Sequence, residues 1–219
     1  MFDAKRLLDQ LVGSGAAGGF AGGLAGGTLA NMLAGKKGRK LAGSALKLGG
    51  LAVVGGLAYK AWQNYQQDAA GQASAQPMDR SVELPPADGA FMPAPNDAVG
   101  ASALSMLLAR SMIAAAKADG QIDARESQAI LNQINALELP AEDKAFLFEE
   151  YGRPLDIEAL ARDVDSPEHA AEVYAASLLM VEPPTAAEKI YLDTLASSLG
   201  LEAGLVQQLH STLEANQAG

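Results

Sequence analysis

The stretch LVGSGAAGGFAGGLAGGTLANMLAG, residues 11–35, carries no charged side chain and decides the first part of the fold. Glycine recurs in it at every fourth position, which on a helix gives one stripe without side chains. The stripe consists of Gly15, Gly19, Gly23 and Gly27. A backbone inside a membrane has to satisfy its own hydrogen bonds, and a glycine stripe lets a second helix approach closely. The stretch therefore predicts a membrane helix that associates with other helices.

A basic cluster and a second apolar stretch follow. The cluster consists of Lys36, Lys37, Arg39 and Lys40. The second stretch runs from Leu41 to Tyr59, contains one charge at Lys47, and is the more hydrophobic of the two, so we expect it to face lipid. If both stretches span as a hairpin, the positive-inside rule keeps the basic loop 36–40 in the cytoplasm and places the C-terminal domain in the periplasm, with Tyr59 and Trp62 at the far interface. If one stretch spans, the domain faces the cytoplasm.

Two alternatives to a membrane helix are a Gly/Ala-rich tail that does not insert and a cleaved signal peptide. Residues 10–35 form an uncharged run that, at about 1.5 Å per residue, exceeds the roughly 30 Å hydrocarbon core. Lys5 and Arg6 resemble the start of a signal peptide, but the following run is longer and richer in glycine than such peptides are. We therefore favour the membrane helix.

Charge divides the chain into three parts. Residues 1–62 hold eight basic and two acidic residues, a net charge of +6 that suits anionic lipid headgroups. Residues 63–99 hold five of the ten prolines and predict a flexible, disordered linker, with an ordered docking role for Phe91 and Met92 as the alternative. Residues 100–219 hold seven basic and nineteen acidic residues, a net charge of −12, so nucleic acid is not expected as a partner.

The acidic part carries helical periodicity and helix-terminal residues at short intervals, and it predicts an all-α bundle of about seven helices. The first is expected at 101–118, where Arg110 in mid-helix favours a core helix over a membrane span. Thr185 and Glu188 predict a capping box, and Gly200 is expected to end the helix that follows. Five further helices are expected: one around Ile134, one that starts at Pro140, one over 156–162, one that starts at Ser166 and one around Leu209.

The segment AKADGQIDARE, residues 116–126, is the one motif with chemistry. Asp119, Asp123 and Glu126, with a glycine between them, match the second half of a calcium loop. The first half is absent, and the ammonium group of Lys117 opposes cation binding at one of the missing positions. The alternative is structural: Gly120 ends one helix, Asp123 caps the next, and Glu126 closes a capping box.

Other polar residues give weaker signals. His169 and His210 lie too far apart for ligand spacing and are expected on solvent-exposed helix faces. An acidic run is expected to be a solvated face, with a basic partner or a metal as the alternative. It comprises Glu149, Glu150, Asp156, Glu158, Asp163 and Asp165. Nothing resembles a nucleophile, base and orienting group, and the absence of cysteine excludes disulfides and thiol chemistry, so we do not expect an enzyme.

The order of these parts resembles a bacterial family of inner-membrane proteins of the YebE type, domain-of-unknown-function family 533. The glycine-rich stretch, KKGRK, AVVGGLAYKAW and AAAKADGQIDARE carry the resemblance. The helical part is similar to the tellurite-resistance TerB domain, matched here by Ala115, Asp119, Gly120, Ile122, Asp123 and Glu126. That resemblance implies a helical module, a stress-related role and metal ligands at Asp119, Asp123 and Glu126. The chain departs from it at 181–184, where a second acidic motif is expected.

These observations predict a membrane-anchored, non-enzymatic interaction or scaffold module of the bacterial inner membrane. Residues 1–62 form the anchor, which binds membrane lipid and self-associates with other copies of the chain through its glycine-rich helix. Residues 63–99 are the linker, and residues 100–219 bind a protein partner without a cofactor. The alternative function is a divalent-cation sensor that uses the motif at 119–126.

Overall fold

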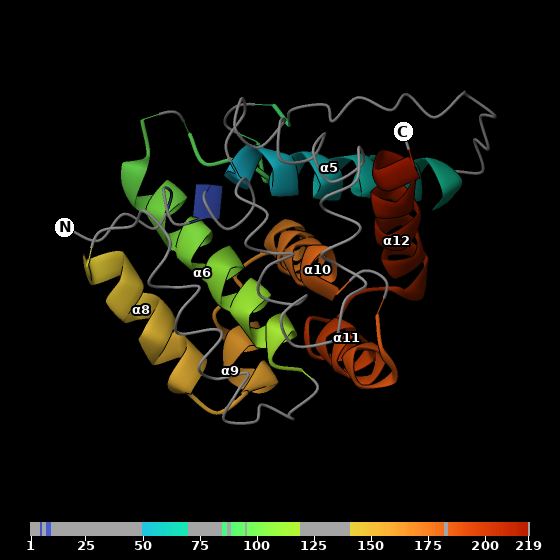
Figure 1. Ribbon diagram of the computed structural model, residues 1–219. Helices are drawn as coiled ribbons and strands as arrows, with labels where there is room; N and C mark the ends of the chain where they lie inside the picture. Colours follow the sequence, from blue (N-terminus) through green and yellow to red (C-terminus); the bar gives the residue numbers. More distant parts are fainter. Residues whose placement is uncertain are drawn as a thin grey trace.

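The computed structural model describes the helical body of the chain. It covers Lys5, Leu8, Asp9 and residues 50–69, 85–86, 89–94, 96–118, 141–181 and 184–218. The glycine stripe at 15–27 and the basic cluster at 36–40 lie outside these residues and stay predictions. The described residues contain helices and no strand, which confirms the predicted all-α fold (Figure 1). The helices are α5 (Gly50–Ala69), α6 (Ala98–Ala116), α8 (Ala141–Gly152), α9 (Ile157–Arg162), α10 (Pro167–Val181), α11 (Ala186–Ser198) and α12 (Ala203–Ala218).

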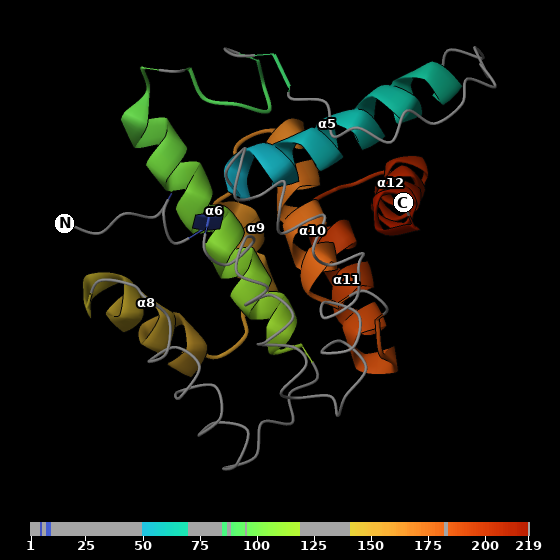
Figure 2. The ribbon, with the colours of Figure 1, turned by 45° about the horizontal axis from the view of Figure 1, so that its top comes forward.

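Helix α10 lies at the centre of the body. It contacts α6, α5, α11 and α12, and Figure 2 shows α5 crossing over α10 while α6 runs beside it. Every side chain from Ala170 to Leu178 is buried, including that of Glu172. A helix that is apolar on all sides is stable only when other elements cover all of its sides. The arrangement of the four neighbouring helices therefore follows from the composition of α10.

The predicted ends of α11 are confirmed, whereas α6 begins at Ala98 rather than at the predicted residue 101, because Asp97 caps it by accepting from the Gly100 N–H. Thr185 Oγ1 accepts a hydrogen bond from the Glu188 backbone N–H (3.3 Å), and the Glu188 carboxylate accepts one from the Thr185 N–H (2.6 Å), which completes the capping box. Gly200 ends α11 with a φ of +66°, and the Gly200 and Leu201 N–H groups donate to carbonyls of the last helical turn. The predicted helix around Ile134 lies outside the described residues.

Helix α5 differs from the expectation for the second apolar stretch. The sequence predicted lipid around Leu51, Val53 and Leu57, but these side chains are at most 5% exposed and pack within the protein. The helix contacts α12 and α10, and it continues to Ala69, past the predicted start of the linker at residue 63. The described part of the second stretch thus belongs to the helical body.

The physical reason is that lipid and a protein core favour the same side chains. A helix of alanine, valine, leucine and glycine gains as much from packing on an apolar helix as from facing acyl chains. Among the described helices, α6 alone has the length and apolar composition of a membrane span. It packs along α10, and a core helix has the same composition, as predicted from Arg110.

Part of the predicted linker is ordered. Phe91 is 4% exposed, and its ring makes edge contacts with Tyr59 (centroids 5.5 Å apart) and Trp62 (5.8 Å) on α5. This corresponds to the docking alternative for Phe91 rather than to an extended tether. The segment 89–94, defined here as the Phe91 segment, therefore forms part of the body.

The conformation of Gly200 gives a test of the fold. Gly200→Ala places a Cβ in the left-handed region and should lower the free energy of unfolding by about 1 kcal/mol. Gly152→Ala is the matched control, because a Cβ there meets open space at the end of α8, and it should leave stability unchanged or slightly raised. Denaturant unfolding of both variants measures the difference. Equal effects of the two substitutions would contradict the described end of α11.

Candidate functional site

A groove of about 740 Å³ opens between the Phe91 segment, the first half of α6 and the start of α10. Its apolar lining includes Met92, Leu104, Met106 and Leu107. Its polar lining consists of Asp97, Arg110, Asp163, Asp165, Ser166 and His169. The Phe91 segment and α6 are consecutive in the chain, but α10 begins 51 residues after the end of α6, so the groove exists only in the folded body.

Beside the groove, three ionisable side chains follow each other: Asp165, two residues before α10, and then His169 and Glu172 on α10. Asp165 Oδ1 lies 2.5 Å from His169 Nδ1, and His169 Nε2 lies 4.0 Å from Glu172 Oε2. Asp165 is 80% exposed, His169 is 23% exposed and Glu172 is fully buried. A carboxylate on one ring nitrogen fixes the orientation of an imidazole. The row therefore leads from solvent through an oriented histidine to a buried acid.

Glu172 is an ionisable group within the core. Neither carboxylate oxygen has a hydrogen-bond partner among the described residues. Burial raises the pKa of Glu172 well above its ordinary range, and the nearby charge of Glu168 raises it further. On α5 the helix passes so close that a Cβ at Gly55 would lie 3.0 Å from Glu172 Oε1 and 3.3 Å from the Phe91 carbonyl oxygen. Only glycine permits this approach without a shift of the neighbouring atoms.

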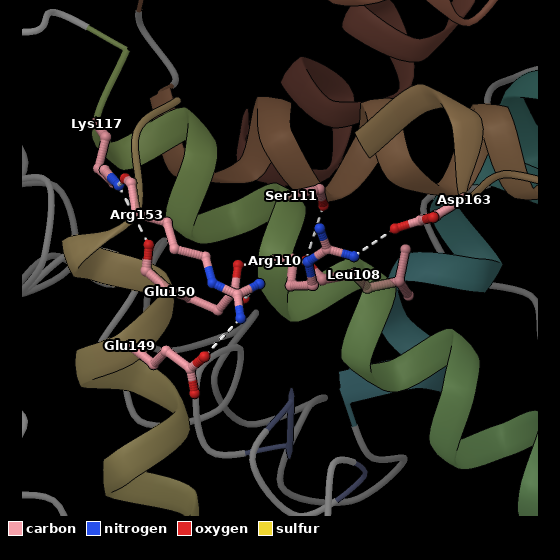
Figure 3. A network of polar contacts seen from close by, with 8 residues as sticks. All are labelled: Leu108, Arg110, Ser111, Lys117, Glu149, Glu150, Arg153 and Asp163. Carbon is pink, nitrogen blue, oxygen red and sulfur yellow. Dashed lines mark hydrogen bonds and ion pairs between the residues drawn. The ribbon is translucent and has the colours of Figure 1, made fainter. Parts of the chain in front are cut away.

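Arg110 joins α6 to the α8 and α9 region, as Figure 3 shows. Its Nη1 donates to Asp163 Oδ2 (2.5 Å) and its Nε donates to Glu150 Oε2 (3.3 Å). Arg153 binds the same Glu150 through Oε1 (2.7 Å) and also binds Glu149 (2.5 Å). The mid-helix arginine of α6 is thus held by carboxylates from two other segments.

Lys117 stabilises the C-terminal end of α8. Its ammonium group donates to the backbone carbonyls of Glu150 (3.2 Å) and Arg153, and lies 5.7 Å from the centre of the Tyr151 ring. A cation is favoured there because the carbonyl end of a helix carries partial negative charge. Burial lowers the pKa of Lys117, and the Glu150 charge opposes that change.

The predicted acidic run is largely occupied by contacts within the protein. Glu149, Glu150 and Asp163 bind arginines, and Asp156 caps α9 by accepting from the Ala159 N–H (2.8 Å). Within the described ranges, no three histidine or acidic side chains come together as a metal site. The predicted ligands Asp119, Asp123 and Glu126 lie outside those ranges.

The structure corrects the expectation for the two histidines. His169 is largely covered and bound to Asp165, and His210 is partly buried with its Nε2 3.0 Å from the Tyr174 hydroxyl. Burial lowers the pKa of His210, although Glu214 and Asp193 act in the opposite direction. Neither side chain lies on a freely solvated face. His169 on α10 and His210 on α12 are both partly covered by neighbouring parts of the body.

Sequence reasoning missed Glu172. A signal was present: it is the one acidic residue between Ala170 and Val181, in a run otherwise made of apolar and small residues. Its 169–172 spacing from His169 also places both side chains on one helix face. The sequence did not show which element covers Glu172, because α5 comes from a segment that we assigned to the membrane.

The Arg110 contacts give a second test. Arg110→Met should destabilise the body by about 1–2 kcal/mol, because it leaves the mostly buried Glu150 with fewer partners. Arg162→Met is the control, since Arg162 is exposed and bonds to its own helix, so its effect should stay within about 0.5 kcal/mol. Thermal unfolding of the two variants makes the comparison. Similar losses for both would show that the Arg110 contacts do not stabilise the body.

Comparison with known proteins gives a family and no activity. The chain matches the family described as "Protein of unknown function (DUF533)" over residues 18–213. It is also similar to an "Uncharacterized protein in ampR 5'region" of Yersinia enterocolitica, with 27% identity over 92 residues, covering 42% of this chain and 66% of that relative. No solved structure matches. The YebE-type and TerB resemblances stay predictions, whereas the match over most of its length places the chain in the DUF533 family.

Proposed function

We propose that this chain is a membrane-anchored, non-enzymatic interaction module whose helical body binds a protein partner in the groove. One observation carries the proposal: the groove combines an apolar floor with an acidic rim. Protein segments bind such surfaces by placing apolar side chains in the floor and charged side chains at the rim. Its volume of about 740 Å³ accommodates a few side chains of a partner.

The charges of the rim favour a basic segment as the partner. Asp97, Asp163 and Asp165 line the groove, and Asp165 is 80% exposed. Arg110 also lines it, but its charge is already compensated by Asp163 and Glu150. The net charge of −12 from residue 100 onward increases the attraction of a basic partner and its rate of association.

The anchor in this proposal is the uncharged stretch 10–35. Its glycine stripe supports helix association in lipid, and the adjacent basic cluster supports binding to anionic headgroups. With α5 packed into the body, the stretch at 10–35 is the segment that we propose to insert into the membrane. Leu8 before this stretch and α5 after it are buried in the same core, so the stretch has to enter and leave the bilayer on one face. The basic cluster favours the cytoplasmic face of the bacterial inner membrane.

A binding role accounts for the groove better than an enzymatic one. The side chains described at the groove comprise an oriented imidazole and carboxylates, of which Asp163 is held by Arg110. Ser166 is the hydroxyl beside His169, and its Oγ accepts a hydrogen bond from the His169 backbone N–H (3.1 Å). Within the described residues, no hydroxyl is held by the His169 ring as a nucleophile, which acyl transfer requires.

Site-specific crosslinking tests the groove. A photoreactive residue at Met106 in the membrane-bound full chain should give a discrete adduct, whereas the same residue at Ile190, 68% exposed on α11, should not. Asp165→Lys should reduce the adduct at least tenfold because it reverses a rim charge, and the exposed Asp193→Lys should not. Equal yields from positions 106 and 190, or no effect of Asp165→Lys, would contradict a basic partner in the groove.

Membrane extraction tests the anchor. Deletion of residues 10–35 should release the chain into the soluble fraction at alkaline pH, whereas the full chain stays with the membrane, because the deleted stretch supplies the insertion energy. Gly19→Leu with Gly23→Leu should keep membrane insertion but abolish self-association in a two-hybrid assay in membranes. Retention of the deletion variant by the membrane would contradict this anchor.

A further inference from the structure

The environment of Glu172 favours its neutral, protonated form over its carboxylate form. It is fully buried at the place where α5 crosses α10, and neither oxygen has a hydrogen-bond partner among the described residues. An ionised carboxylate without partners is costly in a core, whereas a neutral carboxyl costs far less and has one O–H to donate. The Phe91 carbonyl oxygen is an acceptor close by, because a Cβ placed on Gly55 would lie 3.0 Å from Glu172 Oε1 and 3.3 Å from that oxygen.

We propose that Glu172 is a proton-binding site that latches α5 and the Phe91 segment onto α10. With the proton bound, the neutral carboxyl lies against Gly55 and the Phe91 carbonyl, and both elements dock. When the proton leaves, the Glu172 carboxylate faces a carbonyl oxygen and a helix backbone without solvent. The α5 helix and the Phe91 segment then separate from α10, and water reaches the carboxylate. The proposal does not depend on the protein partner proposed for the groove.

His169 provides the route for the proton. Its Nε2 lies 4.0 Å from Glu172 Oε2, and a small movement brings the two atoms within hydrogen-bond distance. Asp165 holds the other ring nitrogen, and the imidazole lines the groove. A proton can therefore pass between solvent and the buried carboxyl through the ring, without prior opening of the body.

On α10 itself, an acid and a histidine lie beside Glu172. Glu168 lies one turn earlier on the same helix and disfavours a second negative charge. The Phe91 segment has no ionisable side chain. The ionisable groups on the four helices packed against α10 are Tyr59, Lys60, Tyr65 and Asp68 on α5, Arg110 on α6, Glu188, Lys189, Tyr191 and Asp193 on α11, and His210 and Glu214 on α12. His169 is the cation-forming group recorded at Glu172, at 4.0 Å.

The latch would connect the membrane end of the chain to the groove. Helix α5 follows the proposed anchor in sequence, and the Phe91 segment forms one wall of the groove. Trp62 on α5 contacts the Phe91 ring, with centroids 5.8 Å apart. Release of the latch therefore changes the hold of the anchor on the body and the width of the groove together.

Trp62, the single tryptophan of the chain, is a direct reporter. In the purified full chain in detergent, its emission should shift to longer wavelength as the pH rises from about 4 to about 10, with a midpoint well above the ordinary glutamate value of about 4.3. The sign follows from the raised pKa of Glu172: the docked form binds the proton more tightly, so docking weakens as the proton is lost. Glu172→Gln, which mimics the neutral acid, should abolish the shift.

Glu168→Gln is the matched control, because it removes one acidic charge from the same helix without touching the latch. It should keep the full shift and move its midpoint to lower pH, since Glu168 raises the pKa of Glu172. His210 titrates at acid pH in all variants and cancels in the comparison. Superimposable profiles of wild type and Glu172→Gln across the pH range would overturn the proposal.

A second variant keeps the test decisive if Glu172→Gln does not fold. Gly55→Ala adds a methyl group 3.0 Å from Glu172 Oε1 and 3.3 Å from the Phe91 carbonyl oxygen, so it should hold α5 away from α10. Its Trp62 emission should be shifted to longer wavelength already at acid pH. Wild-type emission of Gly55→Ala at acid pH would overturn the close contact on which the latch depends.

Discussion

The fold depends on the need to cover α10 on all sides. Its side chains from Ala170 to Leu178 are apolar or small with the exception of Glu172, and all of them are buried. No single partner helix can cover such a surface, because one helix covers about one stripe of another. Helices α5, α6, α11 and α12 therefore surround it. The position of the groove follows from that packing, because it lies where α6 and the Phe91 segment meet the start of α10.

Local signals in the sequence were sufficient for the two ends of α11. Thr185, Glu188 and Gly200 act through bonds to backbone groups a few residues away, so their effect does not depend on the rest of the fold. The partner of α5 could not be predicted in this way. Leu51 and Val53 show that the segment needs apolar neighbours, but their side chains do not distinguish acyl chains from the surface of α10. The glycine stripe, the basic cluster and the motif at 119–126 remain predictions.

The same reason explains which parts of the candidate site the sequence predicted. The acidic run was visible, yet its role depends on Arg110 and Arg153. Arg110 binds Glu150 and Asp163, which lie 40 and 53 residues later in the chain. Arg153 binds Glu150, which lies one helical turn earlier. Glu172 was visible as one acid in an apolar run, but its isolation results from Gly55, more than a hundred residues earlier. A buried acid and a missing side chain are each unremarkable in sequence. Their contact is a property of the folded body alone.

Packing and electrostatics meet in α5. As a helix of the body it covers α10, extends from the region of the proposed anchor, and carries the residues that hold Phe91. The C-terminal end of α5 also contacts α12 and the residue before it. Gln208 Nε2 on α12 donates to Asp68 Oδ2 (2.7 Å), and the Tyr65 hydroxyl donates to Glu202 (2.6 Å). Helix α5 is thus in contact with the Phe91 segment, with α10 and with α12.

The docking of α5 on the body is the central claim, and a distance measurement between α5 and α12 tests it most directly. The chain contains no cysteine, so Asp68→Cys with Gln208→Cys places two spin labels on the full chain in membranes without further changes. Electron–electron dipolar spectroscopy should give one short, narrow distance distribution, because the native side chains at these positions are hydrogen-bonded. A long or broad distribution would contradict the account and favour the prediction from the sequence that α5 lies in the membrane.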